Sequence, residues 1–340
     1  MMNFLNLIRY KNLLFIIGLQ WLMRYSVIRP IFKTFRLDVN YYMTDLQFTL
    51  LVAASVLIAA GGYVINDIFD TRIDEINRPD KVIVGKSITK KLASIIHQVS
   101  TGLGIALGLI VAIWCKNISL GFIIIMVPGM LWFYSASYKR QFLVGNIIIA
   151  FNAALVPVIV GLAEISFLSL PQHYDEFLLQ TPIPKFIYMW VIGFAGFAFL
   201  GTLIREIIKD MEDVEGDREI ESRTMPIIWG INKSKIVVYV LIAFTIGAAL
   251  HVQFKTIDKF VLLEAVEESS LSLRYIIFGI ILPFLYLVYL LVTAKNKGAF
   301  NQASTFMKFI LIIGSLYALI FNFLLCKSQG IALFDLFFIK

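Results

Sequence analysis

Two acidic segments of the chain each contain three aspartates with the spacing D-x-x-D-x-x-x-D. On a helix, at roughly 100° per residue, positions i, i+3 and i+7 lie within about 60° of one another. Six carboxylates in a partly desolvated place need cations to stay ionised together, and oxygen ligands favour Mg²⁺ or Ca²⁺ over a soft metal. The predicted metal ligands are Asn66, Asp67, Asp70 and Asp74 in the first segment and Asp210, Asp213 and Asp217 in the second.

Three glutamates lie beside these stripes and not on them. Glu75 is roughly 80° or more from the first stripe, and Glu212 and Glu215 lie on the far side of the second. We expect their neutralisation to cost little activity. Gly216 could end the second helix before Asp217, which would then reach the site from a loop.

The composition is that of a polytopic membrane protein. The chain is 59% hydrophobic and 16% charged, with a mean hydropathy of +0.82. The net charge of +7 predicts contact with the anionic headgroups of membrane lipids, and no nucleic-acid-binding motif is visible. We therefore expect an all-α helical bundle, with residues 1–340 forming a single transmembrane domain.

Windows of about 20 apolar residues predict nine transmembrane helices. Each acidic stripe directly follows a span, the second and the sixth, so both stripes are placed where a helix leaves the membrane. The predicted spans are 12–32, 46–66, 91–115, 118–136, 142–163, 185–209, 235–254, 274–294 and 304–326.

The first span contains two charges, Arg24 and Arg29. An arginine facing lipid would be costly, so we expect Arg24 to point into the bundle, towards a bound anion. Because no small-residue cleavage site follows, this segment is interpreted as a retained first helix and not as a signal peptide.

Basic residues predict the orientation. Lys and Arg are more numerous in the N-terminal segment and in the loops after even-numbered spans than in the opposite loops. The positive-inside rule then places the N-terminus in the cytoplasm and the C-terminus outside. We expect an integral multi-pass protein of the inner (plasma) membrane, with both acidic segments at the cytoplasmic surface.

Cys115 and Cys326 end two spans on the outer side. Buried free thiols are the favoured interpretation, and a disulfide in an oxidising compartment is the alternative.

The paired motifs resemble those of the UbiA superfamily of intramembrane prenyltransferases, and the likeness runs from about Arg9 to the last helix. The run from Arg205 through Asp217 is similar in particular to the geranylgeranylglycerol-phosphate geranylgeranyltransferase (digeranylgeranylglyceryl phosphate synthase) branch. The other matching segments are Asn77-Arg78-Pro79-Asp80-Lys81, Tyr134-Ser135-Ala136-Ser137-Tyr138-Lys139-Arg140 and Thr224-Met225-Pro226.

This resemblance implies a prenyl diphosphate donor held by Mg²⁺, with Asp70, Asp74, Asp213, Asp217 and Lys139 as the catalytic residues. It also implies that the segment containing Tyr138 and Lys139 borders the diphosphate. Positive-inside anchoring is the alternative role for Arg78 and Lys81, and an interfacial aromatic belt is the alternative for the tyrosines. The expected substrate-binding residues are Asn66, Arg72, Arg78, Lys81, Tyr134, Tyr138, Lys139, Arg205 and Lys209.

The acceptor implied by the branch is lipophilic, the free hydroxyl of a prenylated glycerol phosphate. Arg205 favours this acceptor, since its phosphate needs a further cation. An aromatic quinone precursor is the alternative within the superfamily. A cation-coupled membrane transporter is the alternative of another class, although transporters place their sites near the midplane and not at helix ends.

Overall fold

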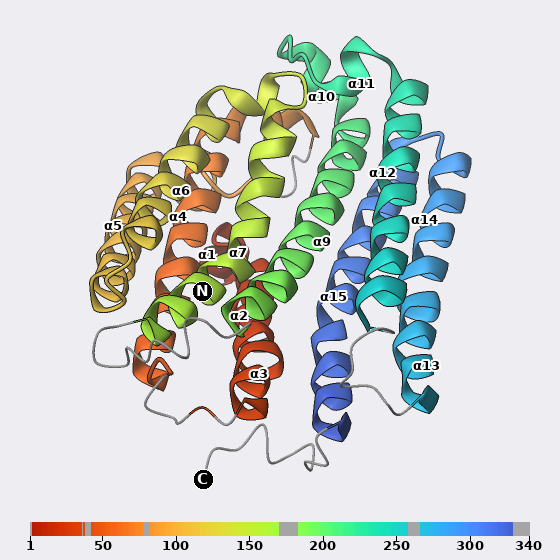
Figure 1. The fold of residues 1–340 in the computed structure, drawn as a ribbon. Coiled ribbons are helices and arrows are strands. Elements are labelled where there is room, and N and C mark those ends of the chain that lie inside the picture. The colour runs from red at the N-terminus through yellow and green to blue at the C-terminus, as the bar shows by residue number, and fades with distance from the viewer. Residues whose placement is uncertain are drawn as a thin grey trace.

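The protein is a bundle of long helices (Figure 1). The structure, a computed structural model, describes residues 2–35, 37, 42–77, 82–169, 183–257 and 266–328. Its long helices are α4 (Asp45–Asn77), α5 (Lys90–Trp114), α6 (Ile118–Ala136), α7 (Val144–Leu168), α9 (Ile183–Glu212), α12 (Ile231–Val252), α14 (Leu282–Thr293) and α15 (Lys297–Ser328). The shorter elements are α1 (Met2–Leu7), α2 (Tyr10–Leu22), η1 (Met23–Ile28), α3 (Arg29–Thr34), η4 (Tyr138–Arg140), α10 (Val214–Glu219), α11 (Met225–Ile228), η6 (Gln253–Ile257), α13 (Val266–Tyr275) and η8 (Ile276–Ile281).

The prediction of an all-α membrane bundle is confirmed. Eight helical segments in the described part of the chain are long and apolar enough to cross a membrane, and they correspond to the second to ninth predicted spans. The first predicted span is helical from Tyr10 to Thr34, but α2 passes through the π-helical turn η1 before α3 begins. The count of nine spans and the orientation stay predictions.

The helices after α3 fall into two groups, α4 to α7 and α9 to α15, which occupy the left and right of Figure 1. Helix α7 packs against α9 where the groups meet, and α9 packs against α15. Small residues permit close approach within the first group: a methyl group at Gly104 of α5 would lie 3.0 Å from the carbonyl oxygen of Ala54 in α4.

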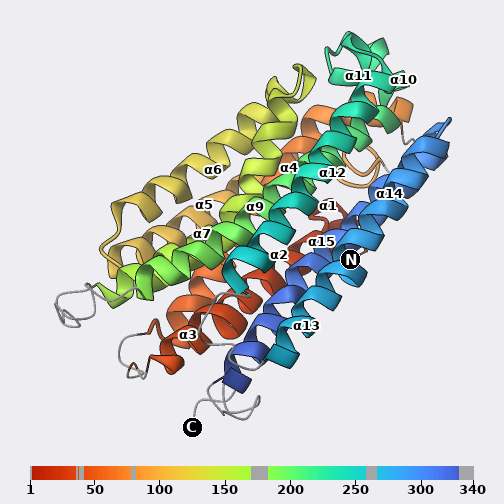
Figure 2. The same cartoon turned by 45° about the vertical axis from the view of Figure 1, so that its right-hand side comes forward.

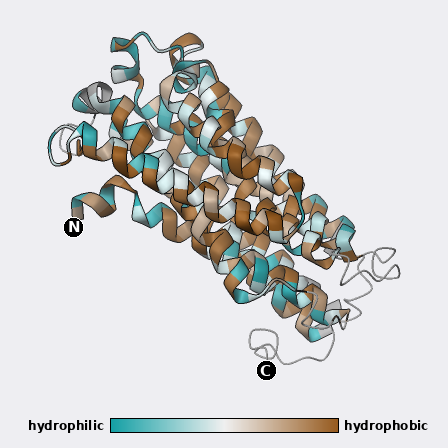
Figure 3. Ribbon diagram, turned by 90° about the vertical axis from the view of Figure 1, so that its left-hand side faces the viewer, coloured by the Kyte–Doolittle hydropathy of each residue, from teal (hydrophilic) through white to brown (hydrophobic). Residues whose placement is uncertain are grey.

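Apolar residues predominate along the helices of the bundle, and polar residues are more frequent towards their ends (Figure 3). Large apolar side chains such as Ile118, Phe244 and Phe278 are exposed on the surface of the bundle. In water such a surface would be unfavourable, whereas in a bilayer it faces lipid. The prediction for Cys115 and Cys326 is also confirmed, because both are buried free thiols.

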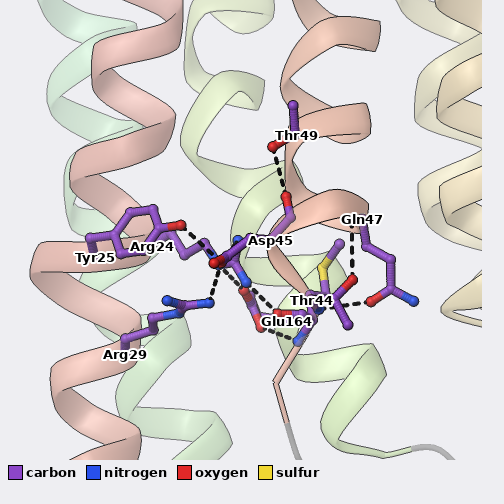
Figure 4. A network of polar contacts seen from close by, with 9 residues as sticks. Arg24, Tyr25, Arg29, Thr44, Asp45, Gln47, Thr49 and Glu164 are labelled. Atoms are coloured by element: carbon purple, nitrogen blue, oxygen red, sulfur yellow. Dashed lines mark hydrogen bonds and ion pairs between the residues drawn. The ribbon is translucent and has the colours of Figure 1, made fainter. Parts of the chain in front are cut away.

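A buried ion pair connects the first helical segment to α7 (Figure 4). Arg24 Nε lies 2.8 Å from Glu164 Oε1, and both side chains are completely buried. The Met43 backbone N–H donates to Glu164 Oε2 at 3.2 Å, and Arg24 donates to the Met43 carbonyl oxygen. Asp45 Oδ1 accepts from Arg29 Nη2 at 2.7 Å and lies 3.3 Å from Arg24 Nη1.

Arg24 therefore points into the bundle as predicted, and its anionic partner is Glu164 of the same chain. The predicted fifth span ended at residue 163, so that Glu164 fell in an outer loop. This prediction is wrong. Helix α7 continues to Leu168. A carboxylate can lie inside this helix because an arginine from η1 neutralises it.

Candidate active site

The first acidic segment occupies the last turns of α4. Asn66 Nδ2 donates to Asp70 Oδ2 at 2.7 Å, so these two side chains share a face one helical turn apart, as their spacing predicts. Asp67 Oδ1 accepts from Arg9 Nη2 at 2.9 Å. The two aspartate side chains are largely buried, and a cation is in contact with each of them.

Lys139 is the cation in contact with Asp70, through its Nζ and the aspartate Oδ1. It lies in η4, the 3₁₀ turn between α6 and α7, and its side chain is 11% exposed. The backbone of Lys139 approaches α7 closely at Gly145, where a methyl group would lie 2.7 Å from Lys139 Cα. A residue other than glycine at position 145 would therefore displace this turn.

The second acidic segment spans the end of α9 and the short helix α10. Gly216 does not end the helix, which was a possibility from the sequence, because it lies within α10 and the break comes earlier, at Asp213. The break is slight. The Asp213 N–H donates to the Lys209 carbonyl oxygen at 3.0 Å, and the Asp217 N–H donates to the Asp213 carbonyl oxygen at 3.0 Å. The helical spacing of the three aspartates is thereby nearly kept.

The fold brings the two acidic segments to the same end of the bundle, where α10 packs against the end of α4 (Figures 1 and 2). Asp217 is buried there. Burial, together with the nearby carboxylates of Asp213 and Asp70, raises the pKa of Asp217 to about 6 against the attraction of Lys209. Lys209 of α9 also attracts Asp67 of α4. These electrostatic interactions place residues of both acidic segments close to one another.

The oxygen donors of the site fit a hard divalent cation. Asn66 Oδ1 is buried and accepts no hydrogen bond from any described residue, although it lies beside the Asp70 carboxylate. Such an orphaned oxygen is suited to a metal ligand. Among the described side chains, no three His, Cys, Asp or Glu residues form a preassembled metal cluster. Asp67 and Asp70 are instead turned towards Arg9 and Lys139.

Four further predicted residues lie in α6, η4 and α4, and two lie outside the described part of the chain. Tyr134 of α6 lies near the charges of Glu206, Asp70 and Asp210. Tyr138 begins η4, beside Lys139, with its ring centroid 6.1 Å from that of Phe133. The backbones of Arg72 and Asp74 lie in α4 but their side chains are not among those described, and Arg78 and Lys81 lie outside the described residues.

Three polar residues of this region were not predicted from the sequence. Arg9, before the first span, contacts Asp67 and lies 4.9 Å from the centroid of the Tyr63 ring. Asn146, at the start of α7, donates to Asp210 Oδ2 at 2.8 Å. Lys308 of α15 lies near Arg205, Lys209 and Glu206. Each is a polar residue at the edge of or inside an apolar segment, and that position was the available signal.

The three off-stripe glutamates differ from one another. Glu75 and Glu215 are exposed, as a control position should be. Glu212 lies off the stripe as predicted, but it is buried against α15, where it accepts from Asn301 Nδ2 at 2.8 Å and from Ser304 Oγ at 3.3 Å. Glu212 is therefore not a suitable control, because its neutralisation would remove these hydrogen bonds and disturb the packing of α9 on α15.

Comparisons with known proteins show the family to which the chain belongs. The sequence profile of the UbiA prenyltransferase family matches residues 40–312. The digeranylgeranylglyceryl phosphate synthase of Methanosphaera stadtmanae is 30% identical over 268 residues, covering 78% of this chain and 84% of that protein. A solved structure of digeranylgeranylglyceryl phosphate synthase has a TM-score of 0.58 and 25% identity, covering 96% of this chain and 98% of that one.

A likeness in fold alone extends to a UbiA homologue from Archaeoglobus fulgidus bound to DMAPP and Mg²⁺. Its TM-score is 0.54 at 15% identity, with 92% of this chain and 98% of that chain covered. The family match spans most of the chain and includes both acidic segments. This chain therefore belongs to the UbiA prenyltransferase family, and it is an integral, multi-pass membrane prenyltransferase.

Proposed function

We propose that this enzyme uses Mg²⁺ to transfer a prenyl group from a prenyl diphosphate to the free hydroxyl of a prenylated glycerol phosphate. The proposal of a prenyl diphosphate donor rests on the convergence of Asp70 and Asp217, which come from two distant segments, at one end of the bundle. The Archaeoglobus homologue, which binds DMAPP and Mg²⁺, supports the donor class. The digeranylgeranylglyceryl phosphate synthases among the relatives support the acceptor class.

In this proposal the ligands to the metal come from both segments. Bound Mg²⁺ would neutralise negative charge on the diphosphate as the allylic C–O bond breaks. The orphaned Asn66 oxygen supports its place among these ligands. The proposed set is Asn66, Asp67, Asp70 and Asp74 from α4, with Asp210 from α9, Asp213 between α9 and α10, and Asp217 from α10.

The basic residues around the aspartates bind the remaining diphosphate oxygens. Lys139 reaches Asp70 from η4, and Arg9 reaches Asp67 from the N-terminal segment, so both lie where a diphosphate would meet the carboxylates. Asn146 holds Asp210 in place from α7. Arg72, Arg78 and Lys81 follow Asp70 in the sequence and are proposed to contribute further positive charge to the diphosphate site.

The transfer exchanges one C–O bond for another. The bond from C1 of the prenyl group to the diphosphate oxygen breaks, and its electron pair leaves with the diphosphate. A lone pair of the acceptor hydroxyl forms an ether bond to C1, and the hydroxyl proton passes to the released diphosphate. Because water would compete with the acceptor for C1, the reaction is suited to a site recessed among helices at the membrane.

The purified protein in lipid vesicles tests this function. Labelled geranylgeranyl diphosphate is supplied with Mg²⁺ and either a geranylgeranylglycerol phosphate or a prenyl-accepting aromatic acid, and the product is identified by its mass. We expect a diether phosphate, formed only with Mg²⁺. Prenylation of the aromatic acid alone would assign the enzyme to another branch, and the absence of any Mg²⁺-dependent transfer would overturn the proposal.

A further inference from the structure

Lys308 is a cation inside the membrane-spanning part of α15. Its side chain is exposed, and it forms no hydrogen bond or ion pair with any residue that the structure describes. A charged side chain inside a membrane-spanning helix is energetically costly, so such a residue usually marks a functional site in which an anion binds it. The mechanism proposed above gives Lys308 no role.

Two contacts between α9 and α15 fix the position of Lys308. At the C-terminal end of α9, Glu212 accepts a hydrogen bond from Ser304, which lies one helical turn before Lys308 in α15. Towards the other end a methyl group at Gly201 would lie 2.6 Å from Leu311 Cδ2 and 3.1 Å from Met307 Cε. The two helices run side by side in opposite directions (Figure 1).

Lys308 therefore lies between these contacts, level with the part of α9 that carries Arg205 and Lys209. Arg205 follows Gly201 by one helical turn, so it belongs to the face that α9 turns towards α15. The two cations thus come from neighbouring helices and converge on the same level of the bundle.

Among the groups that act most strongly on Lys308, positive charge is in excess. Arg205, Lys209 and Arg9 repel it and Glu206 attracts it, and Arg9 is itself paired with Asp67. Glu206 is already in contact with Arg205 Nη1. Arg205 Nε is buried and donates to no described residue, so a donor remains available for an anion. A doubly charged phosphate monoester would compensate this excess.

We propose that the phosphate of the acceptor binds between α9 and α15, in contact with Arg205 and Lys308. This inference rests on the proposed function. The free hydroxyl and the phosphate of a glycerol phosphate are on neighbouring carbons. When the hydroxyl reaches C1 of the prenyl group, the acceptor phosphate must therefore lie near C1, at a place that the donor diphosphate does not occupy. Arg205 satisfies this requirement, because it precedes Asp210 by about 7.5 Å along the helix axis.

Kinetics of Lys308→Gln with two acceptors test the subsite. One acceptor is a geranylgeranylglycerol phosphate, and the other is the same prenylated glycerol without its phosphate. We expect the variant to raise the KM for the phosphorylated acceptor about 10- to 100-fold, the effect of losing a charge-assisted hydrogen bond. The KM for the diphosphate donor and the rate with the acceptor that lacks phosphate should stay near those of the unchanged protein.

Two further variants complete the experiment. Lys308→Arg should restore most of the acceptor affinity, because it keeps the charge and the donors. Lys295→Gln removes the same charge from an exposed position just before α15 and should leave both KM values unchanged. A Lys308→Gln variant that raises the donor KM, or that loses affinity equally for both acceptors, would overturn the subsite. Failure of the unchanged protein to use either acceptor would instead overturn the proposed function, and the subsite with it.

Discussion

Replacing Asp70 by Asn is expected to lower kcat/KM for prenyl transfer by at least about 100-fold, because metal stabilisation of a leaving group contributes several kcal/mol. The substitution keeps the shape of the side chain and removes the charge that a metal ion needs. The residual activity should respond only weakly to raised Mg²⁺. Steady-state kinetics on purified protein over a range of Mg²⁺ concentrations measure both effects.

The chain contains matched controls for this variant. Glu215 lies in α10, two residues from the proposed ligand Asp217, and Glu75 follows Asp74 in α4, yet both are exposed. Glu215→Gln and Glu75→Gln remove the same charge from faces turned to solvent, so kcat/KM should change by no more than roughly twofold. Equal losses in Asp70→Asn and Glu215→Gln would show that the acidic residues act only through bulk charge.

Glu164→Gln is expected to lower the free energy of unfolding by about 3–5 kcal/mol, because it removes the buried counter-ion of the completely buried Arg24 and leaves it the largely exposed Asp45. The change should be visible as a lower midpoint of thermal unfolding in detergent. The activity of the molecules that remain folded should stay close to normal. Asp45, which joins this network at the start of α4, is about 33 Å along the helix axis from Asp67.

A double variant separates the ion pair from simple loss of packing. Arg24→Met combined with Glu164→Leu removes both charges and keeps apolar side chains in the space, and it should be more stable than Glu164→Gln alone. A Glu164→Gln protein that unfolds at the normal temperature would contradict the role given to this pair.

Most of the fold follows from the hydropathy of the chain. Apolar stretches long enough to cross a bilayer locate the second to ninth spans closely, because a helix in lipid has to satisfy all its own backbone hydrogen bonds. The end of α7 was misplaced for a physical reason. Glu164 looks like a loop residue in sequence, and it becomes a helix residue only through Arg24, far away in the chain.

The site was predictable as far as its residues follow helical spacing. Asn66 and Asp70 share one face, and Asp213 and Asp217 keep an i, i+4 backbone bond. The spacing of residues along one helix does not predict which residues of other helices lie beside them. Lys308 was not predicted, because only the packing of α15 on α9 brings it near the acidic and basic residues of the second segment.

The central claim is that the two acidic segments form one metal-dependent site for the diphosphate. Calorimetric titration of the purified protein with geranylgeranyl diphosphate, with and without Mg²⁺, tests it most directly. We expect binding only with Mg²⁺, and its loss in Asp70→Asn and in Asp217→Asn, which change one segment each. Binding that does not need Mg²⁺, or that survives both substitutions, would contradict the claim.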